Sequence, residues 1–206
     1  MKNGTLFRQV INEINKIDFN KSGDRHVFND IYETILKELQ SAGSSGEYYT
    51  PRAVTQFMVD IIHPKLGETV LDPACGTGGF LTCSIDKLRE QAKTPQELHA
   101  VQHAIKGIEK KPLPHLLCTT NLMLNGFDLP AVRRDNYLNK PYKDWGPSDR
   151  VDIILTNPPF GGTEEDGTEQ NFPQKFRTKE TADLFLALII KLLKPHGRAA
   201  VVLPDG

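Results

Sequence analysis

Four residues, Asn157, Pro158, Pro159 and Phe160, follow an apolar, strand-like stretch that spans residues 150–156. Proline has no backbone N–H, so this loop presents carbonyl oxygens with few competing donors, and the Asn157 side chain adds another carbonyl acceptor. Two converging acceptors suit a planar amino group, and a phenyl ring can stack on the ring that carries it. The stretch therefore predicts a cup that binds an –NH2 group and leaves its nitrogen lone pair free to attack an electrophile. A strand end simply terminated by two prolines is the plain alternative.

The sequence DPACGTGGF, residues 72–80, lies between a strand-like segment and a helical one. Its glycines allow a tight turn and the close approach of a ligand to the backbone. The spacing differs from the dinucleotide-binding G-x-G-x-x-G pattern and from the phosphate-binding G-x-x-x-x-G-K-[ST] pattern. Asp72, at the end of the strand, can accept hydrogen bonds from a ligand ammonium group or from loop amides. We therefore expect a ligand-binding loop, against the alternative of an ordinary strand-to-helix turn.

Further acidic positions follow two later strand-like segments. Glu109 can accept both hydroxyls of a ribose at the tip of its strand, although a surface charge beside Lys110 and Lys111 is an equal alternative. Asp135 and Asn136 suit an ordinary turn, and a role at the edge of a ligand adenine rests on their position alone.

Helical and strand-like patterns alternate from residue 47 onwards, which predicts an α/β fold with a mainly parallel sheet flanked by helices. The expected strands are 68–73, 103–110, 131–138, 150–156 and 198–204, and the expected helices are 48–62, 78–91, 114–126 and 181–194. In such a sheet, ligands bind at the carboxyl ends of the strands, near the point where the strand order reverses. We therefore expect the chemical residues above, which all follow strands, to meet in one site.

The helix expected at residues 48–62 has Thr50 placed as its N-cap and Pro51 at its first helical position. Its expected buried stripe consists of Val54, Phe57, Met58, Ile61 and Ile62.

Residues 1–46 are expected to form a helical arm and linker, separate from a domain at 47–206. Two amphipathic helices are predicted, one with its stripe at Leu6, Phe7, Val10, Ile11, Ile14 and Ile17, the other at Phe28, Ile31, Ile35 and Leu39. Two short helices bury too little apolar surface to fold alone. The stretch SAGSSG, residues 41–46, reads as a flexible joint.

The composition indicates a globular protein without a membrane span. The 206 residues are 38% hydrophobic, the mean hydropathy is -0.40, and the longest apolar run covers only residues 184–190. Three cysteines (Cys75, Cys83 and Cys118) show no paired spacing, which argues against a disulfide framework or zinc site and favours the cytoplasm. The formal net charge of -1 means that a nucleic-acid ligand would need local basic patches or a partner subunit.

In this order, the stretches YYTP, DPACGTGGF, GIE, RRDN and NPPF resemble the motifs of amino-group DNA methyltransferases that use S-adenosyl-L-methionine. They most resemble the modification subunit of type I restriction-modification systems, an adenine N6-methyltransferase, and the resemblance covers residue 47 to the C-terminus. It implies a Rossmann-like class I methyltransferase fold, S-adenosyl-L-methionine as cofactor and double-stranded DNA as substrate. It also implies a specificity subunit that reads the DNA sequence, and a restriction subunit as a further partner.

The resemblance also implies the site residues. Those near the methionine end of the cofactor are Glu47, Tyr48, Tyr49, Thr50, Pro51 and Arg52, and those holding its amino acid and sugar are Asp72, Ala74, Gly76, Thr77, Gly78, Gly79 and Glu109. Asp135 and Asn136 lie at its adenine, and the target adenine is held by Asn157, Pro158, Pro159 and Phe160. In the long polar stretch after this cup, Lys175, Arg177 and Lys179 could contact phosphates, whereas Glu164, Glu165 and Asp166 would repel them. A solvated loop is an equal alternative.

Other readings stay open. Cytosine N4 and the amide of a protein glutamine also offer –NH2 groups, although Phe160 and YYTP favour adenine. The family's modification subunits are longer, which suggests a fragment or decayed copy that lacks its final strands and exposes a sheet edge. A non-catalytic scaffold is therefore a second hypothesis, and a nicotinamide oxidoreductase is a distant third. His99 and His103 share a helical spacing, but nothing around them completes a metal site.

Overall fold

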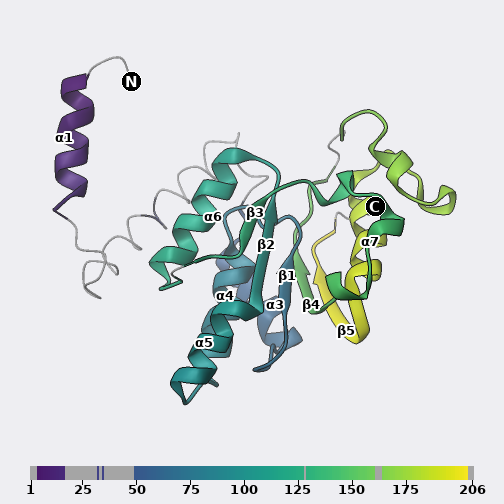
Figure 1. The fold of residues 1–206 in the computed structure, drawn as a ribbon, viewed down its shortest axis with the longest axis horizontal. Helices are drawn as coiled ribbons and strands as arrows, with labels where there is room; N and C mark the ends of the chain where they lie inside the picture. The colour runs from purple at the N-terminus through teal and green to yellow at the C-terminus, as the bar shows by residue number, and fades with distance from the viewer. Residues whose placement is uncertain are drawn as a thin grey trace.

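The computed structural model describes residues 4–16, 32, 34, 49–127, 129–160 and 164–203. Its centre is a five-stranded sheet in the order β3-β2-β1-β4-β5, in which every neighbouring pair is parallel (Figure 1). The strands are β1 (Val70–Asp72), β2 (Ile105–Glu109), β3 (Val132–Arg134), β4 (Val151–Thr156) and β5 (Leu193–Val201). The predicted α/β fold with a parallel sheet is confirmed. The order reverses at β1, which pairs with β2 on one side and β4 on the other.

Helices cover both faces of this sheet. Those that pack on it are α3 (Arg52–Ile62), α4 (Gly79–Arg89), α5 (Pro95–Ala104), α6 (Pro112–Leu124) and α7 (Thr181–Leu192), whereas a further helix, α1 (Gly4–Ile14), lies away from the sheet in Figure 1. Successive strand residues point to opposite faces, so β4 supplies Ile153 and Leu155 to a core shared with α3, α4, α5 and α6. Ile154 points instead into a second core with α7. The result is a three-layer domain in which the strand ends remain free to build a site.

The start of α3 differs from the prediction. The helix begins at Arg52, and Pro51 occupies the N-cap position without a side-chain hydrogen bond among the described atoms. Thr50 does not cap the helix, and its hydroxyl instead accepts a hydrogen bond from Asn157 Nδ2 at 3.1 Å. The prediction of Thr50 as N-cap was therefore wrong.

The buried face of α3 was predicted correctly only in part. Thr55 and Val59 are the fully buried residues of this helix, and Met58 and Ile62 pack against the same core as half-buried side chains. Three residues of the predicted stripe are exposed: Val54, Phe57 and Ile61. Apolar residues occur on two faces of this helix, so periodicity alone selected a stripe rotated away from the buried one. A small polar side chain, Thr55, marks the closest approach to α4, with its Oγ1 3.3 Å from Cys83 Sγ.

One helix was not predicted, and one strand begins earlier than predicted. Helix α5 was not predicted, because its apolar periodicity is weak; a capping box between Thr94 and Glu97 defines its start. Strand β5 begins at Leu193 instead of 198, and the register with β4 shifts between Val151 and Ile153. The shift accommodates His196, whose φ is 65°, so the sequence KPHG forms an irregularity within the strand rather than a turn before it.

The structure describes only part of the N-terminal region for which two helices were predicted. The first expected helix is present as α1, with Leu6, Val10 and Ile11 exposed. The second helix and the boundary at residues 41–46 lie outside the described residues, apart from Tyr32 and Thr34. Tyr32 is buried, and its hydroxyl donates a hydrogen bond to the Leu117 carbonyl of α6.

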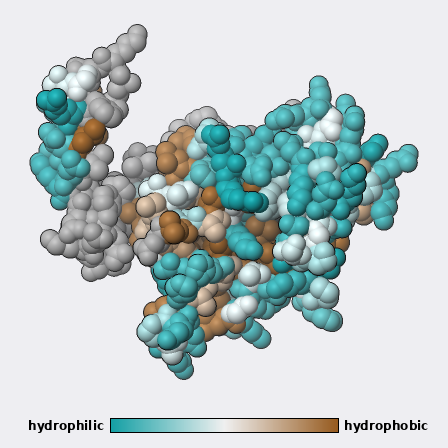
Figure 2. Space-filling model, in the orientation of Figure 1, coloured by the Kyte–Doolittle hydropathy of each residue, from teal (hydrophilic) through white to brown (hydrophobic). Residues whose placement is uncertain are grey.

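The surface is mainly hydrophilic on the face shown in Figure 2, with hydrophobic patches towards the centre. None of the helices in the described part of the chain is long and apolar enough to cross a membrane.

Candidate functional site

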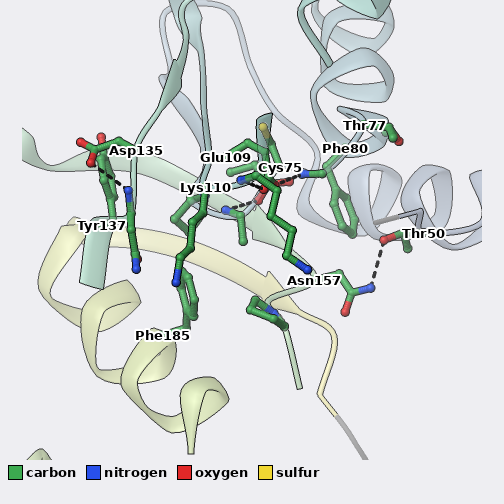
Figure 3. A pocket seen from close by; sticks show the side chains of 18 of the residues that line it. Thr50, Cys75, Thr77, Phe80, Glu109, Lys110, Asp135, Tyr137, Asn157 and Phe185 are labelled. Carbon is green, nitrogen blue, oxygen red and sulfur yellow. Dashed lines mark hydrogen bonds between the residues drawn. The ribbon is translucent and has the colours of Figure 1, made fainter. Parts of the chain in front are cut away.

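A cavity of about 190 Å³ lies at the carboxyl ends of the strands, where the strand order reverses (Figure 3). It brings together the loops after β1, β2, β3 and β4, together with Thr50 from the segment before α3. The predicted site residues that line it are Thr50, Asp72, Ala74, Gly76, Thr77, Gly79, Glu109, Asp135, Asn136, Asn157, Pro159 and Phe160. Predicted residues that follow separate strands therefore line one cavity.

Asp72 forms part of the floor of this cavity. It is 1% exposed, and its Oδ1 accepts a hydrogen bond from the Ala74 amide at 3.0 Å. Burial raises the pKa of Asp72 to about 7, because a charged carboxylate loses hydration there, and the nearby Glu109 carboxylate adds to the rise. A cationic ligand group would compensate this buried negative charge.

Glu109 ends β2 and holds the glycine loop in place. Its Oε2 accepts a hydrogen bond from the Gly76 amide at 3.0 Å, and its Oε1 accepts one from the Lys111 amide at 2.7 Å. The residue is 7% exposed, so the alternative of a surface charge was wrong, and burial raises the pKa of its carboxyl. Each carboxylate oxygen has two lone pairs, so both can still accept a hydrogen bond from a ligand hydroxyl.

Asn157 follows β4 and contributes an unpaired acceptor. Its Nδ2 donates to Thr50 Oγ1, whereas its Oδ1 is buried and has no hydrogen-bond partner among the described residues. Buried polar atoms are nearly always paired, so an acceptor of this kind at a cavity wall indicates a place for a ligand donor. Phe160, 39% exposed, and Pro159 line the same cavity.

Glu164 connects the loops that follow β2 and β3. Glu164 Oε2 accepts hydrogen bonds from Lys110 Nζ at 2.8 Å and Asn136 Nδ2 at 2.7 Å. Asn136 also accepts a hydrogen bond from the Leu138 amide through its Oδ1, so it forms the predicted turn and lines the cavity at once. The alternative of a solvated loop does not hold at Glu164, because its side chain is 13% exposed and lines the cavity.

Several predicted residues do not line the cavity. Glu47 and Tyr48 lie outside the described residues, and those elsewhere are Tyr49, Pro51, Arg52, Gly78, Pro158, Lys175, Arg177 and Lys179. Arg52 pairs with Asp86 at 3.1 Å, and Arg177 Nε donates to the Phe172 carbonyl. Phe172 is 2% exposed and anchors the polar stretch after the cup to the core.

Some lining residues were not predicted: Pro73, Cys75, Phe80, Lys110, Lys111, Tyr137, Glu164 and Phe185. Most are neighbours of predicted residues and could have been included on that basis. Phe185 lies in α7, in a stretch without a functional motif. The apolar periodicity of this helix indicated only core packing.

Gly78 is part of the glycine loop and packs closely against Cys118 of α6. Its replacement is expected to destabilise the fold. Its φ is 87°, and a Cβ at this position would lie 2.7 Å from Cys118 Sγ. We expect Gly78→Ala to lower the free energy of unfolding by about 2–4 kcal/mol, from backbone strain and overpacking together. Urea denaturation measures this loss.

Gly67→Ala is the matched control. Gly67 has a φ of 89°, but a Cβ there would meet nothing within 4 Å in the described structure. We expect a loss of about 1–2 kcal/mol from backbone strain alone. Equal losses in the two variants would contradict the contact with Cys118.

Asp72 predicts a pH dependence of stability. Its pKa rises from 3.8 to about 7 in the folded protein, which therefore holds this proton more tightly than the unfolded chain. The resulting contribution to stability is complete below the lower value and is lost as the pH rises through the higher one. As the pH rises between these two values, the wild type loses this contribution to its free energy of unfolding. Asp72→Asn stays neutral and does not lose it, so we expect its stability relative to wild type to increase with pH over this range. Urea midpoints that keep a constant difference across this range would contradict the raised pKa.

Comparison with known proteins assigns the chain to a family. The N-6 DNA methylase family matches residues 23–206. The methylase subunit of the type I restriction enzyme EcoEI from Escherichia coli is 62% identical over 208 residues, a match that covers 100% of this chain and 42% of that protein. The chain thus spans less than half the length of this relative.

Solved structures agree with this assignment. A Vibrio vulnificus YJ016 modification subunit, assigned to a type I restriction enzyme, superposes with a TM-score of 0.85 and 48% identity over 98% of this chain and 43% of its own. A Listeria monocytogenes protein classed as a class I S-adenosylmethionine-dependent methyltransferase has a TM-score of 0.69 at 19% identity, over 93% of this chain and 57% of its own, and shares the fold. The chain has a class I methyltransferase fold and belongs to the N-6 DNA methylase family.

Proposed function

We propose that this chain transfers a methyl group from S-adenosyl-L-methionine to the N6 amino group of an adenine flipped out of duplex DNA. The observation that carries the proposal is the buried Asn157 Oδ1, an acceptor without a partner in the described structure, in a cavity wall shared with Pro159 and Phe160. The relatives are named as methylase or modification subunits of type I restriction enzymes, which supports the same role here.

The cavity fits the cofactor. Glu109 would hold the ribose hydroxyls, and Asp72, whose charge is unfavourable when unpaired, suits a site for a cationic group. The backbone turns at Gly76 (φ 53°) and Gly78 (φ 87°), and this turn lets a ligand approach the loop closely. Asp135, which lines the cavity beyond β3, would lie near the adenine. When bound, S-adenosyl-L-methionine supplies an electrophilic methyl group.

The cup after β4 would act on the base. Asn157 Oδ1 accepts a hydrogen bond from the amino group, and the Phe160 ring stacks on the adenine. The lone pair of the amino nitrogen is thereby drawn out of conjugation with the ring. As positive charge develops on this nitrogen, the carbonyl oxygen stabilises it electrostatically. The nitrogen loses its proton afterwards, so the cup needs no general base.

Partners and DNA contacts belong to the same proposal. A specificity subunit would select the DNA sequence, and a restriction subunit would join the larger assembly. The exposed Lys175, Arg177 and Lys179 would contact phosphates of the DNA. Division of the chain into an arm at 1–46 and a catalytic domain at 47–206, and a cytoplasmic location, stay predictions.

The test is product identification. The chain, assembled with its specificity subunit, is incubated with duplex DNA and labelled S-adenosyl-L-methionine, and the DNA is digested to nucleosides for mass spectrometry. N6-methyladenine is the expected product, whereas N4-methylcytosine in the digest, or label found in a protein glutamine instead of the DNA, would replace the adenine assignment. Saturable cofactor binding in a titration, with NAD as control, but no methylated product would favour the scaffold hypothesis.

A further inference from the structure

We propose that Thr50 is a positioning residue that orients the Asn157 amide in the acceptor cup. This inference rests on the proposed function and deepens it. Residues 49–51 would then serve the base through Asn157 instead of holding the cofactor through the Thr50 hydroxyl.

The contact joins two segments that are 107 residues apart in the chain. Asn157 Nδ2 donates to Thr50 Oγ1 at 3.1 Å, and both side chains are partly buried (Figure 3). Thr50 has a free hydroxyl for this purpose because Pro51, not Thr50, occupies the N-cap of α3. The residue therefore has a specific partner in the loop after β4.

Close packing keeps the Thr50 segment against the glycine loop. A Cβ at Gly79 would lie 3.8 Å from the Thr50 carbonyl and 3.3 Å from Thr55 Cγ2. The contact with Thr55 would be tight for a Cβ, so the absence of a side chain at residue 79 lets the first turn of α3, and the Thr50 segment before it, lie against the start of α4. This approach places the Thr50 hydroxyl within reach of the β4 loop.

The consequence for the cup follows from amide geometry. An asparagine amide is planar and carries a donor on one side and an acceptor on the other, so its rotation decides which group faces the base. The bond to Thr50 holds the plane of the amide and directs Oδ1, which is unpaired in the described part of the chain, away from Thr50. In the opposite orientation, the Nδ2 hydrogens would face the hydrogens of the target amino group. An amide held in advance has less reorganisation to undergo in the reaction.

The test compares Thr50→Val, which removes the hydroxyl at nearly constant volume, with Thr50→Ser, which keeps it. Methylation is measured with the chain assembled with its specificity subunit, and cofactor affinity is measured by calorimetric titration. We expect Thr50→Val to lower kcat about tenfold, the scale of one neutral hydrogen bond, and to leave the cofactor Kd within about twofold. Thr50→Ser should stay close to wild type in both.

A second readout does not depend on activity. In ¹⁵N-labelled protein, Asn157→Asp identifies the Asn157 side-chain amide signals by their disappearance, and these signals should shift in Thr50→Val but not in Thr50→Ser. A Thr50→Val variant with weaker cofactor binding and normal kcat at saturation would overturn the inference, because Thr50 would then hold the cofactor. Unchanged kcat and unchanged amide signals would also overturn it. Wild-type protein without methylation activity would instead refute the proposed function.

Discussion

Replacing Asn157 with alanine is expected to lower the rate of methylation at saturating cofactor by about 10²–10³-fold, the scale seen when one preorganised polar group is lost from a reaction centre. The variant lacks the acceptor Oδ1, so nothing at this position withdraws the amino lone pair from conjugation or stabilises the developing charge. Cofactor affinity should change little, because Glu109 and the glycine loop follow other strands and bond to each other, whereas the Asn157 amide bonds to Thr50. Single-turnover kinetics and calorimetric titration measure the two effects separately.

Asn157→Asp is the matched variant. It preserves the shape of the side chain and offers acceptor oxygens on both sides, so we expect it to retain far more activity than Asn157→Ala. A variant Asn157→Ala that methylates at the wild-type rate would disprove the role of the cup. It would also strengthen the view that the chain acts as a scaffold.

Replacing Glu109 with alanine is expected to weaken cofactor binding by about 10²-fold or more, since two hydrogen bonds to a charged group are removed. The same change leaves the amides of Gly76 and Lys111 without their carboxylate acceptor. We therefore expect an additional loss in the free energy of unfolding of about 1–3 kcal/mol. Calorimetric titration with S-adenosyl-L-methionine and urea denaturation check the two results.

Two control variants separate these causes. Glu109→Gln keeps the shape and one acceptor oxygen, so it should bind the cofactor more tightly than Glu109→Ala but less tightly than wild type. Glu165→Ala removes an acid whose side chain is 72% exposed and should change neither measurement. Cofactor binding by a folded Glu109→Ala protein at wild-type affinity would refute the ribose assignment.

The sheet and the centre of the site could be predicted because their signals are local. Each strand is a short apolar run, and the residues with chemical potential follow directly at its end. In a parallel sheet this position alone brings Asp72, Glu109 and Asn157 to one edge. The position of the cavity therefore followed from the alternation of strands and helices.

The features that were missed depend on contacts between distant segments. Glu164 lines the cavity because Lys110 and Asn136 pair with it, and no pattern around residue 164 indicates those partners. Thr50 was placed as a helix cap by its local sequence, but Asn157 competes for its hydroxyl. The exposed stripe of α3 was mistaken for the buried one because both faces carry apolar residues, and only packing against α4 distinguishes them.

The central position of β1 also has a consequence for the order of events during synthesis. Strand β1 pairs with β4, and Thr69 donates its amide hydrogen to an Asp152 that lies 83 residues later in the chain. Contacts of such long range form slowly, because a large loop must be closed before they contribute. A ribosome adds about 5–20 residues per second, so the emerging chain contains β1, its glycine loop and β2 for several seconds before β4 is available. The wall that carries Asn157 is therefore available only late, before Glu164 and Phe185 complete the lining, and a nascent chain can form the β1–β2 side of the cavity well before this wall.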